Sequence, residues 1–180
     1  MLTHQGQGHV MFSQAHQTAS SSSQTLCGMN EGDIAVLPFG QVSMDMSKHE
    51  PRRLTRLYSQ NGGFHLRILP DGTVCGGRDE NNSYDILRMQ AVSAGVVIII
   101  GEITGRYLAM NKSGHLYGST SLDDECYFVE TYEENHYNTY FSQLYRWFVA
   151  LKRNGKPKAG PDTYHGQKAI FFLPRSADNT

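Results

Sequence analysis

The sequence predicts an all-β domain that closes into a barrel of about twelve short strands with pseudo-threefold symmetry. From Leu54 onward, turn residues recur between apolar or alternating runs of about five to eight residues, which is the pattern of short strands. No window between residues 54 and 175 has the roughly 3.6-residue period of an amphipathic helix. Closure of the sheet would remove the strand edges that otherwise invite aggregation.

The threefold symmetry follows from an internal repeat. Segments 65–72, 107–114 and 148–155 align, and each has a ring-bearing residue, three mostly apolar residues, a polar turn and a final glycine. These glycines, Gly72, Gly114 and Gly155, are 42 and 41 residues apart. A fixed period of this size is typical of a repeat architecture.

The first 50 residues differ from the rest of the chain. Only five charged residues precede Pro51, and the stretch is rich in Gln, Ser and His. We therefore expect a disordered or weakly ordered extension over residues 1–50 and a folded domain over residues 51–180. The basic cluster from Lys48 to Arg56 is interpreted as a solvated linker, with a weak nuclear-import signal or an extra polyanion contact as the alternative.

Strands are also predicted within the domain. Residues 96–100 are β-branched throughout, so they predict a strand rather than a helix. Apolar residues 147–151 and 169–173 predict two more strands around a basic loop.

This loop carries a concentrated positive charge. Residues 147–174 contain five cations and one acidic residue, Asp162, so their net charge is +4, whereas that of the whole chain is −1. Such a positive surface concentrates polyanions. The five cations are Lys152, Arg153, Lys156, Lys158 and Lys168.

The remaining composition argues against several classes of protein. The three cysteines fit neither a disulfide framework nor a zinc pattern, so we interpret them as free thiols from a reducing compartment. The longest apolar stretch, Ala94–Ile100, is too short to cross a bilayer, and no signal peptide is visible. No spaced nucleophile, acid and base indicate an enzyme, so we expect no catalysis, no cofactor and no metal site.

Several long motifs carry a family resemblance. They are LYSQNGGFHLRILPDGTV (residues 57–74), ITGRYLAMNKSGHLYGS (103–119), EENHYNTY (133–140) and GQKAIFFLP (166–174). In this order they resemble the fibroblast growth factors over roughly residues 52–176. The resemblance implies a β-trefoil fold. It also implies a secreted mitogen that binds receptor tyrosine kinases together with heparan sulfate.

The resemblance places heparin contacts on the basic loop. Ala159 and Asp162 depart from the family pattern, in which basic residues are usual, whereas Lys156 is an added cation. We therefore expect heparin binding to survive and to be weaker. The expected heparin residues are Asn61, Lys152, Arg153, Asn154, Lys156, Lys158, Gln167, Lys168 and the backbone at Ala169.

The resemblance also implies a receptor surface. One part of this surface is segment 135–138. The alternative interpretation of this segment is a simple turn in which asparagine side chains form hydrogen bonds with the backbone. His65 stands where the family has an apolar contact, and Arg175 replaces an apolar residue. Together with a short loop at residues 141–146, these departures put receptor preference in question. The expected receptor residues are Tyr58, His65, Arg78, Glu130, Asn135, Tyr137, Asn138, Leu173 and Pro174.

These observations lead to one expected function and several alternatives. We expect a heparin-binding growth factor that activates fibroblast growth factor receptors with heparan sulfate as co-receptor. We expect a monomer that can dimerise on heparin, with no specific nucleic acid and no membrane insertion. Secretion without a signal peptide is expected, with cytoplasmic and nuclear pools besides. The first alternative is an intracellular trefoil that binds nuclear or channel partners. A trefoil lectin is less consistent, because the cations occur in one repeat only.

Overall fold

The computed structural model describes residues 53–178, so the expected N-terminal extension lies outside the described residues, as does most of the Lys48–Arg56 cluster. The described residues form strands and four 3₁₀ turns. The 3₁₀ turns are η1 (Ser83–Asp85), η2 (Asp124–Cys126), η3 (Gly160–Asp162) and η4 (Lys168–Ile170). The strands are β1 (Arg53–Ser59), β2 (His65–Ile68), β3 (Val74–Gly77), β4 (Leu87–Ser93), β5 (Val96–Gly101), β6 (Tyr107–Met110), β7 (Leu116–Ser119), β8 (Phe128–Tyr132), β9 (Asn138–Ser142) and β10 (Phe172–Ser176).

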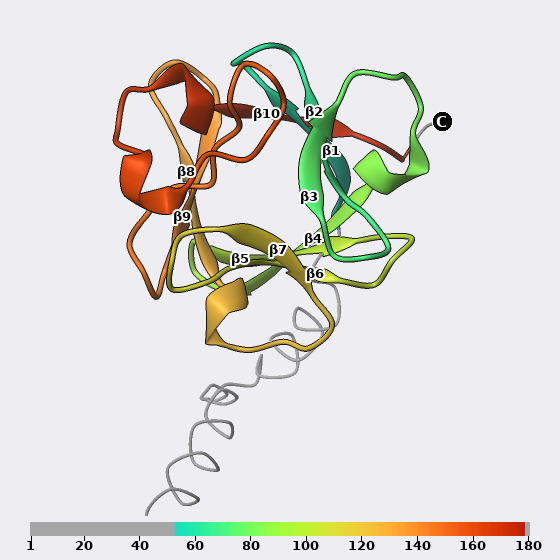
Figure 1. Cartoon of the computed structure of the whole chain (residues 1–180), viewed down its shortest axis with the longest axis horizontal. Helices are drawn as coiled ribbons and strands as arrows, with labels where there is room; N and C mark the ends of the chain where they lie inside the picture. Colours follow the sequence, from blue (N-terminus) through green and yellow to red (C-terminus); the bar gives the residue numbers. More distant parts are fainter. Residues whose placement is uncertain (1–52, 179–180) are drawn as a thin grey trace, which may run out of the picture. The chain divides into compact units, whose positions relative to one another are not determined.

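Six of these strands close into a barrel. The antiparallel pairs run β1–β10–β9–β8–β5, and β4 completes the ring because it pairs with both β5 and β1. The hairpins β2–β3 and β6–β7 extend from this ring. Figure 1 shows these two hairpins and the third unit of the repeat, which contains residues 148–155, around a common centre. This arrangement confirms the predicted all-β, pseudo-threefold β-trefoil.

The repeat in the sequence is a repeat in the core. Residues one position after each ring-bearing residue, Leu66, Leu108 and Val149, are all fully buried. Two positions further along, Ile68, Met110 and Leu151 are fully buried as well. Because side chains alternate between the two faces of a strand, this spacing directs both positions of every unit to the same centre. The predicted strand at residues 96–100 is also confirmed, since β5 is buried along its whole length.

The repeated glycines adopt the conformation that the repeat requires. Gly72, Gly114 and Gly155 have φ angles of +90°, +85° and +84°. Side chains are strained in this left-handed region, so glycine is favoured at each turn. Space is short as well, because a Cβ atom at Gly155 would lie 2.9 Å from Cε1 of Phe64 and 3.1 Å from the carbonyl oxygen of Gly76.

The third unit is less regular than the sequence predicts. Instead of a strand at residues 147–151, it has isolated bridges from Phe148 to Phe141 and from Leu151 to Pro157. The predicted strand at 169–173 is wrong in its first part, since the 3₁₀ turn η4 comes first and β10 begins at Phe172. The described residues therefore contain ten strands where about twelve were expected. Pro157 explains part of this result, because it has no N–H with which to continue a ladder.

Candidate functional site

The basic hairpin, residues 150–158, has short backbone hydrogen bonds although it lacks a regular ladder. The N–H of Lys158 donates to the carbonyl of Ala150 at 2.9 Å, and that of Lys152 donates to Lys156 at 2.8 Å. The Asn154 side-chain oxygen accepts from the N–H of Lys156 at 3.0 Å, which fixes the tip. The backbone, rather than the charged side chains, therefore determines the shape of this surface.

The cations on this surface are available to a ligand. Within residues 53–178, none of the five forms an ion pair or a side-chain hydrogen bond. All are exposed except Lys158, which is half-buried. Four of the cations lie on the basic hairpin, and the fifth lies in η4, which is hydrogen-bonded to the hairpin. Uncompensated cations gathered in this way make a site for sulfate or phosphate groups. The five are Lys152, Arg153, Lys156, Lys158 and Lys168.

Two other predicted heparin residues join the hairpin to its neighbours. The Asn61 amide nitrogen donates to the carbonyl of Leu151 at 2.9 Å. On the other side, the N–H of Leu151 donates to the carbonyl of Ala169 at 3.1 Å. The structure therefore brings together segments that lie about ninety residues apart in the chain. Ala169 as a whole is only 5% exposed and its carbonyl already accepts from Leu151, so it offers little surface to a ligand.

Gln167 shapes the loop more than it offers free polar groups. Its amide nitrogen donates to the carbonyl of Asp162 at 3.2 Å, and its side-chain oxygen accepts from the N–H of Tyr164 at 3.1 Å. Both ends of the amide are thus engaged within the loop between η3 and η4. A ligand would have to compete with these bonds to bind the Gln167 side chain.

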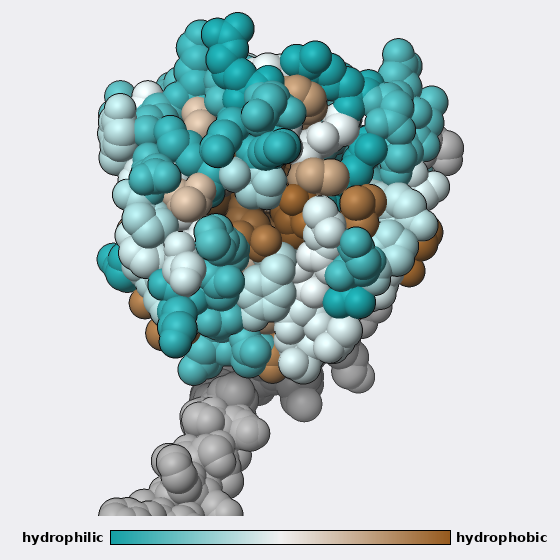
Figure 2. All heavy atoms as spheres, viewed as in Figure 1, coloured by the Kyte–Doolittle hydropathy of each residue, from teal (hydrophilic) through white to brown (hydrophobic). Residues whose placement is uncertain are grey.

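An apolar hollow lies beside the basic hairpin, and sequence reasoning missed it. It has a volume of about 470 Å³ and is lined by the three equivalent residues Val74, Leu116 and Pro157, each two positions after a repeated glycine. Lys152 and Lys158 line it too. Figure 2 shows apolar residues at the centre of the face on which the three units meet, surrounded by hydrophilic residues. The repeat signal could have located this hollow, because it places one residue of each unit there.

The predicted receptor residues follow neighbouring strands. Asn138 of β9 pairs with Phe172 of β10, Leu173 of β10 pairs with Tyr58 of β1, and Tyr58 pairs with His65 of β2. Cross-strand partners lie side by side on the same face of a sheet, so Leu173, Tyr58 and His65 form one row. Asn138 lies on the strand next to this row, and its own partner, Phe172, is fully buried. We call this surface the outer strip; it comprises Tyr58, His65, Asn138, Leu173 and Pro174.

Aromatic and cationic groups surround Tyr58 on this strip. The His65 ring lies edge-on at 5.7 Å between centroids, and the Arg175 guanidinium lies 5.4 Å from the centre of the Tyr58 ring. Arg78 is tied down nearby, since two of its nitrogens donate to the carbonyl of Gly62 at 2.7 and 3.1 Å and its guanidinium covers the Phe64 ring. The Tyr58 ring is half-buried, which suits an amphipathic contact.

The segment 135–138 is an ordered turn. The Asn135 side-chain oxygen accepts from the N–H of Tyr137 at 3.1 Å, and His136 has a φ of +71°. The simple turn reading of this segment is therefore correct for Asn135. That turn also places the Tyr137 ring against Phe171, at 6.4 Å between centroids, where it is half-buried. Such a turn is compatible with the expected receptor contact of Tyr137, because it fixes the backbone that presents the ring.

Glu130 supports the outer strip from beneath. Its carboxylate accepts from Asn138 at 3.1 Å, from the Tyr140 hydroxyl at 2.9 Å and from Arg53 at 3.1 Å, and the Glu130 side chain is 18% exposed. Burial raises the pKa of Tyr140 well above its usual value, and the adjacent carboxylate raises it further. Glu130 is therefore well placed to orient Asn138, a role that its sequence position did not reveal.

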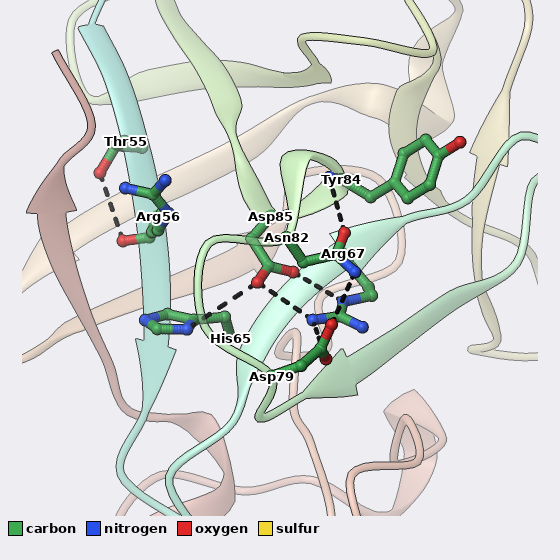
Figure 3. A network of polar contacts seen from close by, with 8 residues as sticks. All are labelled: Thr55, Arg56, His65, Arg67, Asp79, Asn82, Tyr84 and Asp85. Carbon is green, nitrogen blue, oxygen red and sulfur yellow. Dashed lines mark hydrogen bonds and ion pairs between the residues drawn. The ribbon is translucent and has the colours of Figure 1, made fainter. Parts of the chain in front are cut away.

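A buried ionic network lies behind His65 (Figure 3). The fully buried Asp85 accepts from two nitrogens of Arg67 at 2.7 and 3.1 Å, and Arg67 also pairs with Asp79 at 2.8 Å. The Nδ1 atom of His65 lies 3.9 Å from Asp85, beyond hydrogen-bond distance. Burial lowers the pKa of His65, opposed by Asp85 and assisted by Arg175, Arg56 and Arg67. Arg67 spans the gap between η1 and β2, so it fixes the loop that precedes β4.

Within residues 53–178, no group of three or more His, Cys, Asp or Glu side chains could hold a metal ion. In the same part of the chain, no helix is both long and apolar enough to span a membrane.

Comparison with known proteins shows the family to which the chain belongs. The fibroblast growth factor family matches residues 53–173. The chain is 56% identical over 152 residues to a putative fibroblast growth factor 1 of Danio rerio, covering 83% of this chain and 97% of the relative. It is 48% identical to fibroblast growth factor 1 of Xenopus laevis, covering 83% and 98%. It is 54% identical to fibroblast growth factor 2 of Ovis aries, covering 83% and 99%. The chain belongs to the fibroblast growth factor family.

Proposed function

We propose that this growth factor binds heparan sulfate through the basic hairpin and activates receptor tyrosine kinases through the outer strip. The observation that carries the proposal is the group of five cations, all without ion pairs among residues 53–178, on the unit next to that strip. Sulfate groups are anionic acceptors that suit both ammonium and guanidinium donors.

The two surfaces share a structural support. Ala150 and Ala169, which flank the basic residues, belong to a small buried cluster with Ile170 and Phe171. Tyr137 packs against the same cluster from the side of the outer strip. Both surfaces therefore pack on one buried cluster, so a polysaccharide and a receptor can be bound next to each other.

The proposed mechanism requires no catalysis by this chain. The polysaccharide retains the growth factor at cell surfaces, and the outer strip engages a receptor ectodomain. Two growth factor molecules on one polymer then hold two receptors close together. This raises the effective concentration of the receptor kinases for each other, in the way that any shared scaffold does.

A receptor phosphorylation assay tests the proposal. Purified protein is added to cells that each express one receptor isoform and lack heparan sulfate, with and without added heparin. We expect phosphorylation of at least one isoform, strengthened by heparin. If no isoform responds in either condition while the folded protein still binds heparin, the intracellular trefoil becomes the better assignment.

The heparin surface makes a separate prediction. Replacing Lys152 and Lys158 by Gln keeps side chains of similar length and removes two charges. Binding to a linear polyanion releases counterions, as is known for nucleic acids. We therefore expect the variant to bind heparin more weakly, with a plot of log affinity against log salt concentration whose slope is smaller by about two. Heparin-column elution and the shift of the melting temperature on heparin addition measure both effects.

The matched control removes two cations from elsewhere. Lys112 occupies the position in the second unit that Arg153 occupies in the third, and Arg88 pairs with Glu102 on β4 and β5. A Lys112→Gln, Arg88→Gln variant has the same net charge as the hairpin variant. If both double variants elute together, overall charge rather than the basic hairpin determines heparin binding.

A further inference from the structure

A second, smaller basic site lies on the outer face of β1 and β10, away from the basic hairpin. It is a pocket of about 430 Å³. Arg56 lies near the middle of β1, whereas the hairpin docks on Asn61 beyond the end of that strand. We call it the arginine pocket; it is lined by Arg56, His65, Glu80, Asn81, Arg175 and Ser176.

Two arginines lie side by side in the lining of this pocket, with no counterion among the described residues. Arg56 and Arg175 are direct partners in the β1–β10 register. Within residues 53–178, neither side chain forms an ion pair or a hydrogen bond, and Arg175 has only its contact with the Tyr58 ring. Like charges directly opposite on a sheet repel each other. The arrangement is therefore unfavourable in the free protein and would be relieved by an anion between the two guanidinium groups.

A buried nitrogen of His65 adds a second, independent sign of a ligand. The Nε2 atom is inaccessible to solvent and has no hydrogen-bond partner. A buried polar atom without a partner costs free energy. The other ring nitrogen, Nδ1, lies 3.9 Å from Asp85, whose carboxylate already accepts hydrogen bonds from Arg67 (Figure 3). The His65 ring lines the pocket and thus has one nitrogen with unused hydrogen-bonding capacity.

Glu80 completes the electrostatic description. It is exposed at the rim, and within the described residues it pairs with neither arginine. The pocket lining therefore carries two cations and one carboxylate, a net charge of +1 with His65 neutral. Removing the Glu80 charge should strengthen binding of any anion, which makes this residue a useful internal check.

We propose that the arginine pocket receives an acidic side chain, aspartate or glutamate, from the receptor ectodomain. The proposal rests on the proposed function, since it names the chemistry of the partner that the outer strip meets. Two neighbouring guanidinium groups suit the two oxygens of one carboxylate. The pocket adjoins Tyr58 and Leu173, and an aromatic and an aliphatic contact beside a charged pair are typical of protein interfaces.

The pocket also predicts a dependence on pH. A carboxylate beside His65 favours the protonated ring, so its binding is coupled to proton uptake. The charged groups that face His65 are Asp85, Arg175, Arg56 and Arg67. In the free protein its pKa is lowered from the ordinary value of 6.5, mainly by burial. Receptor affinity is therefore expected to rise as the pH falls from about 7.5 to about 5.5, and a His65→Phe variant should lose this component.

Receptor binding by surface plasmon resonance gives the first test. An Arg56→Met, Arg175→Met variant should bind about tenfold more weakly than a Lys112→Met, Arg88→Met control, with less sensitivity to salt. A Glu80→Gln variant should bind more tightly than the parent. If the parent binds and all three variants match it, the arginine pocket does not contact the receptor and the proposal is wrong.

A second test does not depend on the receptor. The parent is titrated with N-acetyl-aspartate N-methylamide, a single carboxylate, while the arginine Nε–H signals are followed by NMR. The Arg56 and Arg175 signals should shift, and the matching asparagine compound should leave them unchanged. Absence of a shift overturns carboxylate binding even if no receptor binds the parent, so failure of the pocket and failure of the proposed function are separate results.

Heparin is the competing occupant. The arginine variant should elute from heparin at the same salt concentration as the Lys112→Met, Arg88→Met control. Earlier elution than that control would show that the pocket binds sulfate groups of the polysaccharide, and would contradict the assignment to a protein carboxylate.

Discussion

Replacing Asp85 by Ala is expected to lower the free energy of unfolding by about 3 kcal/mol. Asp85 is fully buried and accepts two hydrogen bonds from Arg67, at 2.7 and 3.1 Å. Removing one partner of a buried ion pair leaves the other charge without compensation. Chemical denaturation, monitored by the fluorescence of Trp147, measures the loss.

Asp79 provides the matched comparison, because it pairs with the same guanidinium at 2.8 Å but its side chain is 61% exposed. Exposed ion pairs contribute roughly 1 kcal/mol or less, so Asp79→Ala should be nearly neutral. Equal losses for the two variants would show that burial is not what makes the Arg67–Asp85 pair important.

The second large effect is expected on receptor affinity. Tyr137→Ala should weaken receptor binding by about thirtyfold, roughly 2 kcal/mol, if this ring is a central anchor. The ring is half-buried against Phe171 and is presented by an ordered turn, so little conformational freedom is lost when it binds. Titration of the variant against immobilised receptor ectodomain measures the change.

Two controls accompany this variant. Tyr164 is 66% exposed in the loop that follows η3, and Tyr164→Ala removes an equally large ring from the neighbourhood of the basic hairpin. Tyr137→Phe keeps the ring and tests the hydroxyl alone. Heparin elution should be unchanged in all three variants, because none loses a cation. Unaltered receptor affinity in folded Tyr137→Ala would remove this turn from the interface.

The fold was predictable because its signal is local and repeated. The repeated glycines mark three turns of the same geometry, and the positions one and three residues after each ring-bearing residue are buried in every unit. Local turn chemistry and side-chain alternation together restrict the architecture strongly. The cations of the basic hairpin were predictable for a similar reason, since they lie within one short stretch of chain.

The parts that could not be predicted depend on distant residues. Arg56 and Arg175 are 119 positions apart, and only the β1–β10 register makes them neighbours. Glu130, which was expected to contact a receptor, also pairs with Arg53 of β1, 77 positions away in the sequence, and only the fold brings these two side chains together. The regular strand expected at residues 147–151 does not form. The sequence could not reveal this, because local apolar character does not show whether a partner strand lies alongside.

The irregular third unit has a consequence for amide hydrogen exchange. Its two isolated bridges leave the backbone around the basic hairpin with fewer ladder hydrogen bonds than β2–β3 or β6–β7. Segments of this kind open at a lower free-energy cost than the rest of a domain. The unit that carries the cations is therefore the one whose amides a bound polysaccharide can protect most, so deuterium uptake at residues 150–158 reports occupancy directly.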